Sequence, residues 1–237
     1  MQSSDFHNWP PLVWLLAAVL AVVIIVLQVG ILGYAYEKIG IQRRTAFLIL
    51  VLSLVGSYVN LPIGDMMPEQ PTRFHVYMDP ASGGTRLEPL GTSIALNVGG
   101  AIVPTLISIY LLVKNALYVQ MIAGVAFVSA VVHWLAVIEP GMGVSVPIFA
   151  PPIVSAGVSM ILARHHAAPL AYISGSLGTL IGADLLNLSA LVETGPAVVS
   201  IGGAGTFDGV FLTGILAVLL AVSPRPVTDD DPPPNYA

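Results

Sequence analysis

The chain has 237 residues, of which 56% are hydrophobic and only 9% are charged, and its mean hydropathy is +0.87. A soluble globular domain carries about 25% charged residues, so this composition predicts a polytopic membrane protein surrounded by membrane lipid. The sequence contains no cysteine and no basic cluster. These absences exclude disulfides, cysteine nucleophiles and thiolate metal sites, and they argue against a nucleic-acid partner.

In chain order, the apolar runs predict an all-α fold with about seven transmembrane helices. The first run is longer than the apolar part of a signal peptide and follows no basic segment, so we expect it to be retained. The expected helices cover residues 12–36, 45–61, 93–113, 117–138, 144–164, 168–191 and 206–222. They form a single transmembrane domain, residues 1–222, and the Pro- and Asp-rich residues 223–237 are expected to be a disordered cytoplasmic tail.

The distribution of basic residues predicts the orientation of these helices. Most Lys and Arg residues fall on one side of the seven-helix arrangement: Lys38, Arg43, Arg44, Lys114, Arg164 and Arg225. The positive-inside rule makes that side cytoplasmic, with the N-terminus outside and the C-terminus inside. We therefore expect an integral membrane protein with this orientation, and we expect its membrane to be the plasma (inner) membrane of a prokaryote.

One long outer loop, residues 62–92, interrupts the apolar pattern. Within it, TRFHVYMD alternates between polar and apolar residues as a strand does, and DPASGGT has the composition of a turn. The loop is therefore expected to contain a small hairpin that lies over the outer mouth of the helical domain.

Polar side chains collect in the outer layer of the expected helices. Asp184 lies about 10 Å below the outer boundary at ~1.5 Å per residue, and Asn187 shares its helix face. Asn97, His133 and Asp208 reach the same layer from three other helices. Because a carboxylate at membrane depth is costly, on the order of 2–3 kcal/mol, this layer predicts a polar, acidic intramembrane site near the outer face.

Small residues predict where helices approach one another. Ser174, Gly178 and Gly182 recur every four residues, which is a small-xxx-small packing face. Gly99 and Gly100 allow a close approach or a kink in the helix expected over 93–113. The prolines of VPIFAPP favour an irregular segment that lines a cavity: Pro147, Pro151 and Pro152.

The stretch SIGGAGTFDG, residues 200–209, is expected to be a glycine-rich connector close to the helix that carries Asp184. Its unwound backbone would line the site at Gly205 and Thr206, as at transporter half-helices. The close approach of the connector is expected to bring Asp208 near Asp184.

Four motifs resemble an uncharacterised bacterial and archaeal multi-pass membrane family, domain of unknown function 1614. They are NVGGAIVPTLISIYLL (97–112), PGMGVSVPIFAPP (140–152), APLAYISGSLGTLIGADLLNL (168–188) and SIGGAGTFDGVFLTGILAVLLA (200–221). The similarity covers roughly residues 45–222. It implies a shared fold and brings no established activity with it.

A weaker, partial resemblance concerns intramembrane aspartyl proteases of the Gly-x-Gly-Asp type, such as presenilins and prepilin peptidases. Phe207-Asp208 is similar to their aromatic-Asp element, and Gly182-Ala183-Asp184 is loosely similar to the other. In this chain the two elements occur in reverse order, and no Pro-Ala-Leu motif follows. The resemblance implies hydrolysis by two aspartates.

Three hypotheses of function follow. The first is an intramembrane aspartyl-type hydrolase in which Asp184 and Asp208 share one proton and act on a membrane-embedded or outer-face substrate. The second is a proton- or cation-coupled transporter or solute-binding protein, in which polar groups join the aspartates: Asn97, His133, Asn187, Gly205 and Thr206. The third is a non-catalytic subunit of a membrane complex. No cofactor or metal is expected, since no compact motif such as H-E-x-x-H is present, and a homo-oligomer is compatible with all three.

Overall fold

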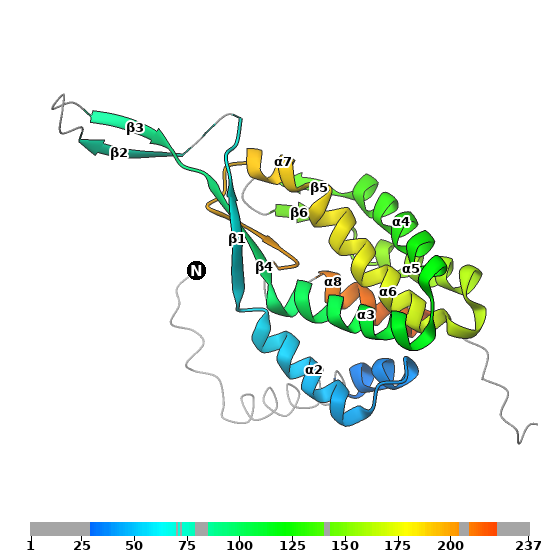
Figure 1. The fold of residues 1–237 in the computed structure, drawn as a ribbon. Coiled ribbons are helices and arrows are strands. Elements are labelled where there is room, and N and C mark those ends of the chain that lie inside the picture. The colour runs from blue at the N-terminus through cyan, green and yellow to red at the C-terminus, as the bar shows by residue number, and fades with distance from the viewer. Residues whose placement is uncertain are drawn as a thin grey trace, which may run out of the picture.

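The computed structural model describes residues 29–69, 71, 73–78, 85–139, 143–203 and 209–221. In this part of the chain, a group of helices packs against one end of a narrow sheet, and a hairpin projects from the far end of that sheet (Figure 1). The residues of the sheet and those of the helices alternate along the chain, so the two layers are built together.

One helix, α6 (Ala167–Thr179), lies at the centre of the helical group. All of its residues except Leu177 are buried, and it contacts helices on several sides. The other helices are residues 29–38, α2 (Arg43–Gly56), α3 (Val103–Asn115), α4 (Tyr118–Leu135), α5 (Ala150–Leu162), α7 (Leu188–Glu193) and α8 (Gly209–Leu220). The described residues also form three short helical turns: the π-helical η2 (Val98–Ile102) and η4 (Leu180–Leu185), and the 3₁₀ turn η3 (Arg164–His166).

The main sheet of the described residues joins strands that are distant in sequence. Its order is β1 (Asn60–Met66), β4 (Thr92–Asn97) and β7 (Val198–Ile201), with β4 antiparallel to β1 and parallel to β7. Two hairpins accompany it: β2 (Phe74–Met78) with β3 (Thr85–Pro89), and β5 (Val137–Glu139) with β6 (Gly143–Ser145).

The prediction of an all-α protein with about seven transmembrane helices is wrong, because the fold is mixed α/β. Among the described residues, two helices, Val98–Asn115 and Tyr118–Leu135, are long and apolar enough to cross a membrane. Helices of 13 residues such as α5 reach roughly 20 Å at ~1.5 Å per residue, short of the ~30 Å of hydrocarbon. The predicted orientation assumed seven spans and is not retained.

The physical reason for the error is that an apolar stretch of sequence looks the same whether lipid or other parts of the protein surround it. The expected helix 93–113 begins as β4, because its backbone pairs with β1 on one side and β7 on the other. The expected helix 168–191 is apolar because α6 is enclosed by protein. Most of the expected helix 12–36 and the tail, residues 223–237, lie outside the described residues.

Other predictions about the fold are confirmed. The 62–92 loop contains the predicted β2–β3 hairpin, but the hairpin extends away from the helices (Figure 1) and does not lie over them as expected. The small-residue face, which continues from α6 into η4, packs against α4: a Cβ added to Gly178 would lie 2.6 Å from Val128 Cγ1, and one added to Gly182 in η4 would lie 2.5 Å from the Ser129 carbonyl oxygen. Only glycine permits these contacts.

The predicted close approach at Gly99 is also confirmed, and its partner is α2. The Ser53 hydroxyl donates a hydrogen bond to the Gly99 carbonyl over 2.8 Å. A Cβ added to Gly99 would overlap the carbonyl oxygen of Ser53 and lie 2.5 Å from the Ser57 nitrogen. The glycine therefore lets the start of the α3 segment lie directly on the α2 backbone.

Candidate functional site

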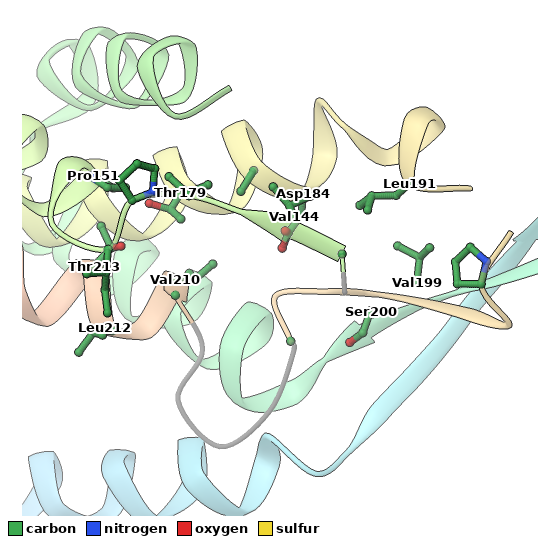
Figure 2. Close-up of a pocket in the computed structure, with 18 of the residues that line it drawn as sticks. Val144, Pro151, Thr179, Asp184, Leu191, Val199, Ser200, Val210, Leu212 and Thr213 are labelled. Atoms are coloured by element: carbon green, nitrogen blue, oxygen red, sulfur yellow. The ribbon is translucent and has the colours of Figure 1, made fainter. Parts of the chain in front are cut away.

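A pocket of about 380 Å³ opens where η4, β7, α8 and the segment from β6 to α5 meet. Figure 2 shows Asp184 directed from η4 toward the strand that carries Ser200, with Thr179 and Thr213 farther along the pocket. Most of the wall is apolar, including Val144 and Val199. An apolar wall with a few polar groups is typical of small-molecule sites.

Asp184 is the ionisable side chain among the described residues that line this pocket. Its Oδ2 accepts a hydrogen bond of 2.6 Å from the backbone N–H of Gly202. Burial raises the pKa of the Asp184 carboxyl to about 6, and the hydrogen bond from Gly202 opposes part of this rise. Asp184 lies outside the two helices long enough to cross a membrane. The raised pKa means that Asp184 stays protonated to a higher pH than a solvent-exposed aspartate does.

The η4 turn that presents Asp184 is stabilised by Asn187. In a π-helical turn the backbone hydrogen bonds join residues five apart, and such turns occur frequently at functional sites. The Asn187 amide donates to the carbonyl oxygens of Gly182 and Ala183, over 2.9 Å in each case. The Asn187 side chain thus holds the turn, and it is not among the described residues lining the pocket.

Gly202 fixes the connector against Asp184. Its φ is +73°, a backbone conformation that favours glycine, and an added Cβ would lie 2.6 Å from the Ala101 nitrogen. A Cβ added to Gly203 would lie 2.6 Å from Asn97 Cβ. The glycines therefore let the connector lie between η2 and η4, which confirms that it approaches the helix carrying Asp184.

Two other predicted site residues lie away from the pocket wall described above. Asn97 is buried between β4 and η2, where its amide donates to the Ser57 carbonyl at 2.7 Å and to Asn60 Oδ1 at 3.0 Å. Its own oxygen accepts the N–H of Gly100 at 2.9 Å. His133 is an exposed residue in the last turn of α4.

Three further predicted residues, Gly205, Thr206 and Asp208, lie outside the described residues. The described residues on either side of this segment, Gly203 and Gly209, both line the pocket. Within the part of the chain that the structure describes, no three His, Asp or Glu side chains gather in a metal-binding group.

The sequence did not single out the pocket hydroxyls as site residues: Thr179, Thr194, Ser200 and Thr213. Thr194 donates to the Leu191 carbonyl and Ser200 donates to Asn60 Oδ1. The Thr179 hydroxyl is buried without a hydrogen-bond partner in the described structure. The proline-rich segment was the sequence feature that pointed to this pocket: Pro147 and Pro151 line it as predicted, whereas Pro152 does not.

Comparison with known proteins finds one family. A family model described as "Protein of unknown function (DUF1614)" matches residues 54–220, close to the range expected from the sequence motifs. No curated protein and no solved structure matches the chain.

Proposed function

The chain belongs to the family of proteins of unknown function DUF1614, and on that premise we propose that it is a membrane protein that binds a small solute next to Asp184. The observation that carries this proposal is a single carboxyl group, with its pKa raised to about 6, in the wall of a largely apolar pocket. Such a carboxyl is able to couple solute binding to release of a proton.

The surface of α4 supports a location in the membrane. Val119, Ile122 and Trp134 are 77%, 66% and 82% exposed, and monomeric soluble proteins rarely expose large contiguous apolar patches. An 18-residue helix is about 27 Å long at ~1.5 Å per residue, close to the ~30 Å thickness of the hydrocarbon. We infer that lipid covers this face, and the resemblance to a bacterial and archaeal family favours the plasma membrane of a prokaryote.

The sheet supports a position for Asp184 at the membrane boundary. An open sheet edge does not face hydrocarbon, since its backbone groups would lack partners. The β1–β4–β7 sheet therefore belongs in water, beyond the ends of the helices. Because Asp184 accepts its hydrogen bond from Gly202, immediately after β7, the pocket lies at the junction of the two layers.

The pocket chemistry favours a solute with an apolar body and one cationic group. The apolar wall accommodates the body, and the ionised Asp184 attracts the cation. A cation and a proton then compete for the same carboxylate, so each weakens binding of the other by the same factor. Binding of the cation below pH 6 should therefore release protons.

Binding of benzyltrimethylammonium, a permanent cation with an apolar ring, tests the proposed solute site. Calorimetry on the full-length protein in detergent, in buffers of different ionisation enthalpy, measures affinity and proton release together. We expect Asp184→Asn to lose at least tenfold in affinity, while Asp65→Asn, an exposed aspartate on β1, keeps the wild-type affinity. Absence of binding by the wild type, or equal binding by Asp184→Asn, would reject the proposal.

A second candidate function is the aspartyl-type hydrolase with Asp184 and Asp208. The observation in its favour is that Gly209, the covalent neighbour of Asp208, lines the Asp184 pocket. Two close carboxyls share a proton, so that one activates water while the other protonates the leaving group. Cleavage of a fluorogenic membrane-spanning peptide in proteoliposomes should then disappear in both Asp184→Asn and Asp208→Asn and persist in Asp65→Asn. Activity in either of the first two variants would reject the hydrolase.

A further inference from the structure

Three hydroxyl groups form a line along one face of α6. Tyr172, Ser176 and Thr179 are spaced by four and three residues, which places them on the same side of a helix. The first two are 0% exposed and Thr179 is 5% exposed. At the Tyr172 end, Tyr36 of the helix over residues 29–38 continues the line, with 6.3 Å between the two ring centroids. We call these four residues the α6 hydroxyl line.

None of the four hydroxyl oxygens has a hydrogen-bond partner within the described residues. Leaving one buried polar group unsatisfied costs about 1–3 kcal/mol, and native proteins leave few of them. Three of the groups are also close to one another: the rings of Tyr36 and Tyr172 are neighbours, and the Ser176 hydroxyl and the Tyr172 ring contact the same point on α8, Gly214. Polar groups without hydrogen-bond partners are therefore aligned inside the helical group.

The π-helical turn brings Asp184 toward the same face. In a regular α-helix the residue four positions after Thr179 would follow it on that face, and this residue is Ala183. In η4 the backbone hydrogen bonds join residues five apart. Asp184 is five residues after Thr179, so the wider turn returns it toward the α6 hydroxyl line, and both side chains line the pocket.

The line lies at the contact between α6 and α8. A Cβ added to Gly214 of α8 would overlap the Ser176 hydroxyl and lie 3.2 Å from Tyr172 Cε2. Thr213, the preceding residue, lines the pocket. From Tyr172 to Asp184 the helix rises roughly 18 Å at ~1.5 Å per residue. At the far end, the Lys38 ammonium bonds to the carbonyl oxygens of Val218, Leu219 and Ala221.

We propose that the α6 hydroxyl line relays protons between the Asp184 pocket and the Tyr36 end of the helices. A hydroxyl both donates and accepts. Each oxygen, directly or through one intervening water, accepts a proton from one neighbour while its own proton passes to the next. The Asp184 carboxyl gives up one proton at the pocket end, and a water molecule beyond Tyr36 accepts one at the other end. Between them one O–H bond forms for each that breaks, so no hydroxyl ionises and a single proton is transferred overall. The relay rests on the proposed function in one respect: the end of the relay at the pocket is Asp184.

The test is proton entry into proteoliposomes that contain the full-length protein and a trapped pH-sensitive dye, with the membrane potential clamped. Tyr172→Phe, Tyr36→Phe and Ser176→Ala each remove one hydroxyl and keep the rest of the packing. We expect each to slow proton entry at least tenfold. The matched control is Tyr34→Phe, on the same helix as Tyr36 and 58% exposed, which should keep the wild-type rate. Thermal unfolding in detergent verifies that the variants are folded.

The outcomes separate the relay from the solute site. Wild-type proton entry no faster than in empty liposomes would overturn the relay, as would unchanged rates in Tyr172→Phe and Ser176→Ala. Neither result affects binding of benzyltrimethylammonium at Asp184. Conversely, suppose that loss of these hydroxyls slows proton entry and that the protein does not bind benzyltrimethylammonium. This result would reject the solute site and support the relay.

Discussion

Helices α4 and α6 are both apolar and lie against each other, yet their surroundings are opposite. On α4, large side chains such as Phe127 and Trp134 are exposed, whereas α6 is buried except at Leu177. Gly178 of α6 and Gly182 of the following turn η4 allow the close contact with α4. On α6 the polar groups are internal, and they lead to Asp184. The comparison shows that an apolar helix is exposed or enclosed according to what packs around it: α4 keeps large apolar side chains on the surface, and α6 lies at the centre of the helical group.

The largest expected effect comes from a charge on the exposed face of α4. Phe127 lies in the middle of that helix and is exposed. A lysine at the centre of a lipid-facing helix costs about 2.5–3.5 kcal/mol in insertion, whereas a surface substitution in water stays within about 0.5 kcal/mol. We expect Phe127→Lys to reduce the membrane-inserted fraction strongly, measured by carbonate extraction. Full insertion of this variant would mean that α4 does not face lipid.

The next largest effect is expected at the contact that α4 makes with α6 and η4. A Cβ at Gly182 meets the α4 backbone, so we expect Gly182→Ala to lower the free energy of unfolding by about 2 kcal/mol. Gly157 in α5 has open space around its Cα, so the control Gly157→Ala should be neutral or stabilising by up to about 1 kcal/mol. Denaturant titration in mixed micelles measures both. Equal effects would contradict the α4–α6 packing.

This pair also tests the hypothesis of a non-catalytic subunit. If the protein serves only as a packing subunit, Gly182→Ala should abolish cellular function and Asp184→Asn should leave it intact. A phenotype for Asp184→Asn at normal protein abundance would favour the solute site instead.

The smallest effect concerns the pH dependence of stability. The pKa of Asp184 rises from 3.8 to about 6 on folding. The contribution of Asp184 to the free energy of unfolding is therefore fully present below about pH 4 and is lost as the pH rises through 6. We expect Asp184→Asn to remove this decline and to be about 1–2 kcal/mol more stable than the wild type at pH 7.5. Denaturant titrations at pH 5 and 7.5 measure the difference. A parallel pH dependence in the variant would show that other groups cause it.

Several features followed from local patterns. The alternation in TRFHVYMD predicted the hairpin that contains β2, and the spacing of Gly178 and Gly182 predicted the face that α4 covers. Asp184 was singled out because an isolated carboxylate in an apolar helix is costly. The match to the family follows the motifs between residues 54 and 220.

Other features depended on partners that are distant in sequence. Asn97 was expected to serve a site, but Ser57, Asn60 and Gly100 engage its amide. Thr179, Ser200 and Thr213 become neighbours only when η4, β7 and α8 meet around the pocket.

The sequence by itself determined a largely apolar chain with a hairpin, close glycine contacts and one costly carboxyl, because these depend on composition and short-range spacing. Only the tertiary structure decided that Thr92–Asn97 is a strand, that α6 is enclosed, and that Asp184 lies in a pocket. The physical reason is that strand pairing and burial depend on what covers a segment, and the covering groups come from residues far away in the chain.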